Sequence, residues 1–228
     1  MRRVLNVVRL QLINKQTFIW VPLIILVGAT ALSVLVYWMI PGDGPKYGGA
    51  GQAPLWYFLA IGIGAMTYTF PFSQAMSITR RDFFLGTMLT AVLGSALMGG
   101  LFTAGGAIEL ATGGYGVNGW VFYWPWLWES GPGGAFLFAF TLALFFFVAG
   151  FTGATIFKSW GLMVLTITWI TLALLLIGWF YLVTTLELWG QVAETISTLG
   201  LIGLTLWGLV VVAVLSAVSF LAFRRARP

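Results

Sequence analysis

Acidic, imidazole and thiol side chains are the groups most able to do chemistry, and this chain has six Asp and Glu residues, no His and no Cys. It therefore lacks the usual general base near neutral pH and any thiolate nucleophile or zinc ligand. Glu109 lies nearest to the middle of an apolar run, but it has no neighbouring carboxylate with which to form an acid–base pair. We interpret it as a solvated carboxylate at the membrane interface.

Two other features that could carry chemistry are equally incomplete. Ser95 follows Gly94, as a nucleophilic serine can, but no evident base accompanies it. The sequence has no GxxxxGK[ST] phosphate-binding loop. We therefore predict that the chain is not an enzyme, and that any uphill transport takes its energy from a partner. A channel stays open as an alternative, although no selectivity-filter sequence stands out.

Residues 73–86 form the one basic segment of any length between apolar runs. Ser77 or Thr79 could cap a short helix there, because both are favoured N-cap residues. Asp82 would then lie in the first turn, where a negative charge is favourable. The segment therefore predicts a short helix at the surface of the membrane.

Arg80 and Arg81 would give that helix a basic surface, and Phe83 and Phe84 would give it an aromatic anchor. Arg and aromatic residues dominate the hot spots of protein interfaces, so the helix could dock into a groove of another protein. The alternative is that the same four residues only fix the loop at the membrane surface. The composition of the segment leaves both interpretations open.

The rest of the chain indicates an all-α membrane protein. It is 60% hydrophobic and 7% charged, whereas soluble domains carry about 25% charged residues. Six apolar runs are long enough to cross a bilayer, which takes about 20 residues. We predict one transmembrane domain over residues 1–228, with spans at 17–40, 54–72, 87–111, 134–157, 161–183 and 199–223.

Basic residues predict the orientation of these spans. Lys and Arg flanking short loops stay in the cytoplasm, and all but Lys46 fall on one side. They are Arg2, Arg3, Arg9, Lys15, Arg80, Arg81, Lys158, Arg224, Arg225 and Arg227. We therefore predict cytoplasmic termini in the plasma membrane. The net charge of +5 reflects topology and contact with anionic lipid rather than nucleic-acid binding.

Residues 1–16 and the predicted third span each show a periodic pattern. Val4, Val7, Val8 and Leu12 share one helical face, which predicts a helix lying in the inner membrane interface, or else a cytoplasmic extension of the first span. In the third span, small residues at every fourth position would let another helix approach closely. They are Thr87, Ala91, Ser95, Gly99, Thr103, Ala107 and Ala111. This small-residue ladder could pack the chain's own bundle or face a second subunit or a transport pathway.

The stretch Ser-Ile-Thr-Arg-Arg-Asp-Phe-Phe-Leu-Gly-Thr, from Ser77 to Thr87, follows the second of six predicted spans. In sequence and position it resembles the loop of type-2 ABC export permeases of actinobacteria, which are encoded separately from their ATPase. The layout of spans is similar along nearly the whole chain. The resemblance implies a cytoplasmic coupling helix over Thr79 to Phe84 that docks on the nucleotide-binding subunit, flanked by Arg9 and Lys15.

The resemblance also implies the wider assembly. Two permease chains, identical or related, would bind two ATPase subunits, which hold ATP and Mg, and would export an amphipathic drug, peptide or lipid. Short outer helices would connect the last two spans, with Trp189, Val192 and Ile196 on the apolar face of a hairpin. We interpret the aromatic run 120–128 as interfacial anchoring. The alternative function is a non-transporting immunity, sensor or scaffold protein in the membrane.

Overall fold

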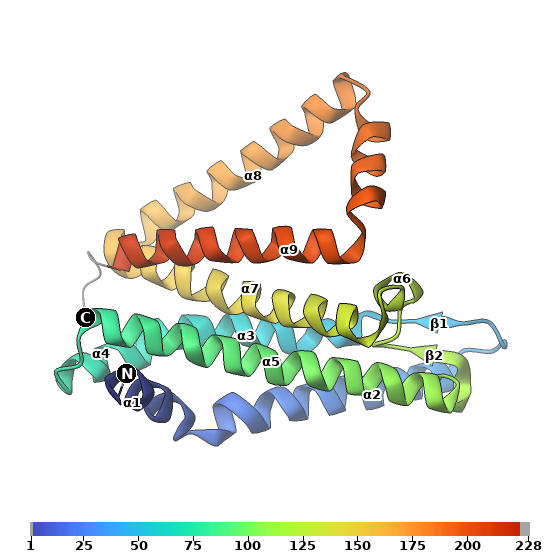
Figure 1. Cartoon of the computed structure of the whole chain (residues 1–228), viewed down its shortest axis with the longest axis horizontal. Coiled ribbons are helices and arrows are strands. Elements are labelled where there is room, and N and C mark those ends of the chain that lie inside the picture. Colours follow the sequence, from blue (N-terminus) through green and yellow to red (C-terminus); the bar gives the residue numbers. More distant parts are fainter. Residues whose placement is uncertain (1, 224–228) are drawn as a thin grey trace.

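A computed structural model describes residues 2–223 of the chain, and these are helical almost throughout (Figure 1). Six helices are long and apolar enough to cross a membrane, and each overlaps one predicted span, although several extend beyond it. They cover Gln16–Met39, Gly49–Ala75, Arg80–Thr112, Gly131–Trp160, Leu162–Thr185 and Trp189–Phe223. The prediction of a helical chain with six helices long and apolar enough to cross a membrane is confirmed.

The elements follow one another as α1 (Arg2–Leu12), η1 (Gln16–Trp20), α2 (Val21–Met39), β1 (Lys46–Tyr47), η2 (Gly49–Gln52), α3 (Ala53–Gly64), η3 (Ala65–Thr69), α4 (Phe70–Ala75), α5 (Arg80–Thr112), η4 (Gly114–Asn118), β2 (Gly119–Trp120), α6 (Pro125–Trp128), α7 (Gly131–Trp160), α8 (Leu162–Thr185) and α9 (Trp189–Phe223). The segments η1, η3 and η4 are π-helical, and η2 is a 3₁₀ turn.

Helix α7 is the centre of the bundle and packs against α3, α5 and α9. Its contact with α3 is unusually close, because each helix places a glycine against the backbone of the other. A Cβ atom on Gly150 would lie 2.1 Å from the carbonyl oxygen of Leu59, and one on Gly62 would lie 2.1 Å from that of Phe147. The two backbones therefore touch directly, which is a common way for membrane helices to associate.

Two loops at one end of the bundle are joined in a small cap, formed by residues 40–52 and 113–130. Strands β1 and β2 pair in parallel within it, with Lys46 opposite Gly119. The Lys46 ammonium donates to the Tyr37 carbonyl at 2.9 Å, and the Asn118 amide donates to the Asp43 carbonyl at 2.8 Å. The sequence predicted two separate loops here and gave no sign of the pairing.

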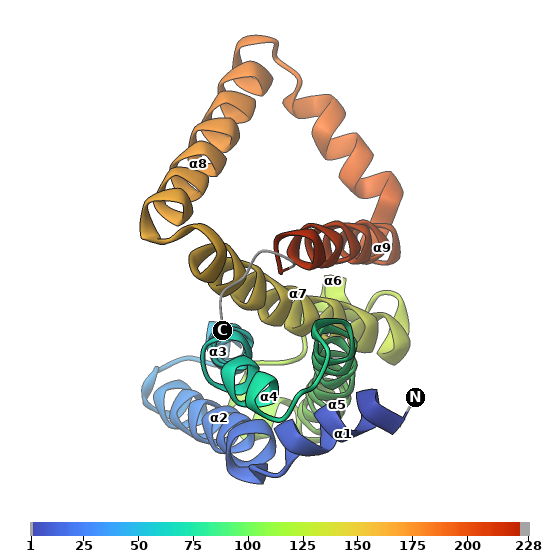
Figure 2. The ribbon, with the colours of Figure 1, turned by 90° about the vertical axis from the view of Figure 1, so that its left-hand side faces the viewer.

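Helices α8 and α9 leave the bundle in a way that the sequence did not predict. The chain reverses its direction at Gly161, but α8 then diverges from α7, so the two helices pack together only near this turn (Figures 1 and 2). Helix α9 bends at Gly200, where φ is 59°, and only the part after the bend runs along α7 (Figure 1). Residues 189–199 form one helical segment rather than the expected hairpin of short helices.

Candidate functional site

Helix α1, the start of α5 and the ends of α7 and α9 lie at the same end of the bundle (Figure 1), and the segments there carry most of the basic residues. Those at this end are Arg3, Arg9, Lys15, Arg80, Arg81 and Lys158. Lys46 lies in the cap at the opposite end (Figure 1). This segregation matches the predicted one. Arg224, Arg225 and Arg227 lie outside the described residues, as does the side chain of Arg2.

Helix α1 packs against the first turns of α5. The Val7 side chain is fully buried, and a Cβ atom on Gly86 would lie 2.5 Å from that of Val7. The Gln11 amide donates to the Thr87 hydroxyl at 2.9 Å. The apolar face predicted for the interfacial helix, which includes the buried Val8, is therefore covered at least in part by the chain itself.

The expected separate helix between the second and third spans does not appear in the described part of the chain. Instead, α5 runs without a break from Arg80 to Thr112. The capping signal itself was read correctly, since the Thr79 hydroxyl accepts from the Asp82 amide at 3.1 Å and donates to its carboxylate at 2.7 Å. The helix continues through Gly86, where α1 packs so closely that an added Cβ atom would lie 2.5 Å from that of Val7.

The Thr79 cap leads to a first prediction. Replacing Thr79 with Ala should lower the free energy of unfolding by about 1 kcal/mol, because the amide of Asp82 then loses its partner. Ser77→Ala is the matched control, since the Ser77 side chain is exposed. Thermal unfolding in mild detergent measures both variants, and equal losses would contradict a capping role for Thr79.

Phe83 and Phe84 are buried, so their expected role as anchors for a partner is wrong. The Phe83 ring stacks on that of Phe223 at 5.9 Å and tilts against Phe70 at 5.3 Å. The Phe84 ring meets that of Phe220 at 5.0 Å. These rings join the start of α5 to α4 and to the end of α9, and the sequence could not distinguish such core aromatics from interfacial ones.

The two arginines of this segment differ in their exposure to solvent. Arg80 is half-buried: its guanidinium donates to the Phe223 carbonyl at 3.2 Å and lies over the Phe70 ring at 6.0 Å. A positive charge beside the last carbonyls of a helix is favourable, so Arg80 stabilises the end of α9. Arg81 is exposed. Of the pair, Arg81 is therefore the one available to a partner.

A groove of about 480 Å³ separates α1 from the turn between α4 and α5. We call it the basic groove; it is lined by Arg3, Asn6, Arg9, Leu10, Ile13, Met76, Ser77 and Ile78. Two of its apolar side chains are strongly exposed, Ile13 at 76% and Met76 at 56%. Apolar groups flanked by arginines suit a partner that offers apolar side chains and carboxylates. Ile13 and Met76 were not among the predicted contact residues, and their only signal in the sequence is their place outside the predicted spans.

The small-residue ladder mostly serves the chain's own bundle. Ala91, Ser95 and Gly99 are buried, as is Thr87. A Cβ atom on Gly99 would lie 3.1 Å from the Phe136 side chain and carbonyl of α7. Nearer the cap the small residues are less buried: Thr103 is half-buried, and Ala107 and Ala111 are exposed. Intrachain packing thus accounts for its first half.

Glu109 is fully buried, so its interpretation as a solvated carboxylate is wrong. Its Oε1 accepts from the Val121 amide at 2.9 Å, and its Oε2 accepts from those of Phe122 and Tyr123 at 2.9 and 2.7 Å. The Tyr115 hydroxyl is a further hydrogen-bond partner. Converging backbone amides form a site for an anion, and here the anion is the chain's own carboxylate.

Burial raises the pKa of the Tyr115 phenol, and the neighbouring Glu109 carboxylate raises it further. Tyr115 therefore stays protonated near neutral pH and keeps its hydrogen bond to Glu109. Among the described residues, no group of three or more His, Cys, Asp or Glu side chains could hold a metal ion. Glu109 thus binds the cap to α5.

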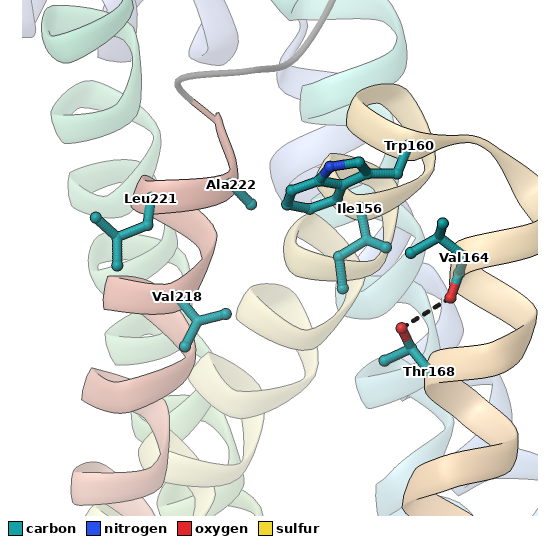
Figure 3. A pocket seen from close by; sticks show the side chains of 7 residues that line it. All are labelled: Ile156, Trp160, Val164, Thr168, Val218, Leu221 and Ala222. Carbon is teal, nitrogen blue, oxygen red and sulfur yellow. Dashed lines mark hydrogen bonds between the residues drawn. The ribbon is translucent and has the colours of Figure 1, made fainter.

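A second opening lies between α7, α8 and α9, with a volume of about 700 Å³ (Figure 3). It is lined by Ile156, Trp160, Val164, Thr168, Val218, Leu221 and Ala222. The Thr168 hydroxyl donates to the Val164 carbonyl at 2.8 Å, so it offers no free donor. We call this opening the wedge; its lining is apolar apart from Thr168 and the indole N–H of Trp160, so it suits an apolar chain or another helix.

Comparisons with known proteins add nothing to this geometry: the chain matches no protein-family model, no curated protein and no solved structure.

Proposed function

We propose that this chain is the membrane-spanning permease subunit of an ATP-driven ABC exporter in the plasma membrane. The observation that carries the proposal is the basic groove, which combines exposed apolar side chains with Arg3 and Arg9 at one end of a chain with six helices long and apolar enough to cross a membrane. The groove would receive a separate ATPase subunit, and Arg81 would extend the contact. In this proposal the main contact lies on α1 and the turn 76–79, with Arg81 at its edge, rather than on a separate coupling helix.

In this proposal, helix α5 would transmit a movement at the basic groove to the opposite end of the bundle. Helix α5 starts beside the groove and spans 33 residues without a break, which is about 50 Å at 1.5 Å per residue. At its start, the phenylalanine cluster links it to α4 and α9. At its other end, Glu109 holds the cap. ATP and Mg would be bound by the ATPase, whose closure would move α1 and α5 together.

The exposed surfaces suit a second permease chain and an amphipathic substrate. Helix α8 is apolar, and Val183 is its one buried residue, so lipid or another subunit must cover it in a membrane. The wedge beside it is apolar as well. A drug, peptide or lipid with an apolar portion would fit such walls, and two chains together would enclose the pathway.

Affinity purification of the tagged chain from its native membrane tests the proposal. A nucleotide-binding subunit should co-purify, and Arg9→Glu or Met76→Asp should each reduce its amount about tenfold, as expected for hot-spot positions. Lys158→Glu is the control, because Lys158 is at the same end but outside the groove. If the native chain brings down no ATPase in several detergents, an immunity, sensor or scaffold role replaces the proposal. If Lys158→Glu loses as much, the groove is not the contact.

A further inference from the structure

A pocket of about 390 Å³ lies between the bundle and the cap, which carries the labels β1, β2 and α6 in Figure 1. We call it the aromatic pocket. Its lining is apolar apart from the Gln52 amide and the indole N–H groups of Trp124 and Trp126, and five of its side chains are aromatic. The lining residues are Gly48, Gly49, Gly51, Gln52, Leu55, Phe102, Val121, Trp124, Trp126, Leu127, Phe138, Leu142 and Phe146.

Two of the five rings belong to the aromatic run 120–128, whose composition suggests interfacial anchoring. Anchoring would expose these rings, but of the six aromatic side chains in the run only Trp126 is exposed. Trp120 and Trp128 donate their indole N–H groups to acceptors of the cap itself, at 2.9 and 3.3 Å. Trp124 and Trp126 line the pocket. The run therefore builds the cap and one wall of the pocket.

The other three rings come from the bundle. Phe102 belongs to α5, and Phe138 and Phe146 lie two turns apart on one face of α7. Neighbouring rings fix the orientation of several of them. The rings of Trp126 and Phe138 meet edge to face at 5.7 Å, and those of Phe102 and Phe122 do so at 5.2 Å. The rings are therefore held in position before a ligand binds, which lowers the entropic cost of binding.

Aromatic walls favour a particular kind of ligand. The face of an aromatic ring carries a negative potential that attracts cations, and Trp attracts them most strongly. A primary ammonium or a hydrated ion would bring N–H or O–H donors, but Gln52 is the only lining side chain with an acceptor. A quaternary ammonium has no such donors, and its methyl groups gain apolar contact as well. The lining therefore suits a quaternary ammonium better than other cations.

The charges around the pocket have the same preference. Three carboxylates belong to the cap or bind it, and they are Asp43, Glu109 and Glu129. The Glu109 carboxylate lies beside the pocket wall, since it accepts from the amide of Val121, a lining residue. Lys46 is the one basic residue of the cap. Its ammonium donates to the Tyr37 carbonyl at 2.9 Å, and neither residue lines the pocket. The surroundings therefore favour a cation over an anion.

We propose that the aromatic pocket binds an amphipathic quaternary ammonium cation. The charged group lies against the rings of Trp124 and Trp126, and the apolar part of the ligand packs against Phe102 and Phe138. A soluble organic cation and the head group of a choline lipid share this chemistry. The site does not rest on the proposed function, because one chain lines it without an ATPase or a second subunit.

Equilibrium dialysis of labelled benzyltrimethylammonium against the full chain in dodecyl maltoside tests the site. This detergent has neither a charge nor a trimethylammonium group. We expect saturable binding of one molecule per chain. Choline should displace the probe, and 3,3-dimethyl-1-butanol, which has the same shape without the charge, should do so about tenfold less well. Equal displacement by the two compounds would overturn the proposal, and so would the absence of saturable binding.

Phospholipid added to the micelles separates the two sources of the cation. Displacement of the probe by phosphatidylcholine but not by phosphatidylethanolamine, whose ammonium is primary, would assign the pocket to a lipid head group. Displacement by neither lipid would assign it to a soluble cation. Equal displacement by both would show that the pocket does not recognise a quaternary ammonium, and would overturn the proposal.

Variants of Trp126 test the wall itself. Trp126→Leu should bind the probe about tenfold less tightly, because a ring face is lost, and Trp126→Phe should lose less because it keeps a ring. Trp207→Leu is the control, since Trp207 is also exposed, at 61% against 49% for Trp126, but does not line the pocket. Native binding by Trp126→Leu, or equal loss in Trp207→Leu, would contradict the proposal. The comparison of choline with its uncharged analogue needs no variant, so it decides the matter if Trp126→Leu does not fold.

Discussion

Replacing Glu109 with Ala should unfold the cap while the spans stay helical. The change leaves the amides of Val121, Phe122 and Tyr123 without an acceptor in a buried site. A buried donor that loses its partner costs about 1–3 kcal/mol, so we expect a loss of about 3 kcal/mol or more. Limited proteolysis within residues 113–130, together with thermal unfolding, measures it. Glu109→Gln should have a smaller effect, because it keeps one acceptor oxygen.

Glu129→Gln is the matched control for this prediction. Glu129 lies in the same cap but is exposed, so its replacement should change neither the cleavage pattern nor the unfolding temperature. Equal protease resistance of Glu109→Ala and the native chain would contradict the role of Glu109 in holding the cap.

The position of Glu109 shows what hydropathy could and could not reveal. Its place at the end of the third span follows from the apolar pattern, since a bilayer requires about 20 apolar residues in each spanning helix. Its burial depends on residues 119–123 folding back so that three amides point at one carboxylate. Backbone amides carry no sequence signature, and a carboxylate at a span end is commonly solvated, so the sequence favoured the wrong environment.

At the basic end, too, some features could be predicted from the sequence and others could not. The Thr79 cap and the basic cluster were predictable, because capping and charge placement depend on a few residues near each other in sequence. The burial of Phe83 and Phe84 depends on Phe70 and Phe223, which lie far away in the chain. Apolar residues are favourable both in a protein core and in lipid, so hydropathy cannot distinguish these environments.

The path of α8 away from the bundle could not be predicted from hydropathy for the same reason. It is apolar around its whole circumference, and such a helix can face lipid or protein equally well. Only packing features, such as glycines at a close contact, specify partners in a membrane. Helix α7 has such glycines and is the centre of the bundle, whereas no Cβ contact lies within 4 Å of Gly178 in α8.

Replacing Gly150 with Ala should therefore loosen the bundle at its centre. The new Cβ atom would lie 2.1 Å from the Leu59 carbonyl oxygen, so α3 and α7 must move apart along their contact. Overpacking of this kind costs about 1–3 kcal/mol, which thermal unfolding in mild detergent would detect. Gly153→Ala, three residues later in the same helix, has no atom within 4 Å of its new Cβ and should unfold like the native chain.

A double variant would show that the loss comes from this one contact. Gly62 meets α7 in the same crossing, since its Cβ atom would lie 2.1 Å from the Phe147 carbonyl oxygen. Once Gly150→Ala has separated the helices, Gly62→Ala meets less resistance. The two losses should therefore sum to more than the loss of the double variant, because residues that share a backbone shift are not additive. Strictly additive losses would mean that the helices do not separate as a unit, and the close glycine contact would then be two independent ones.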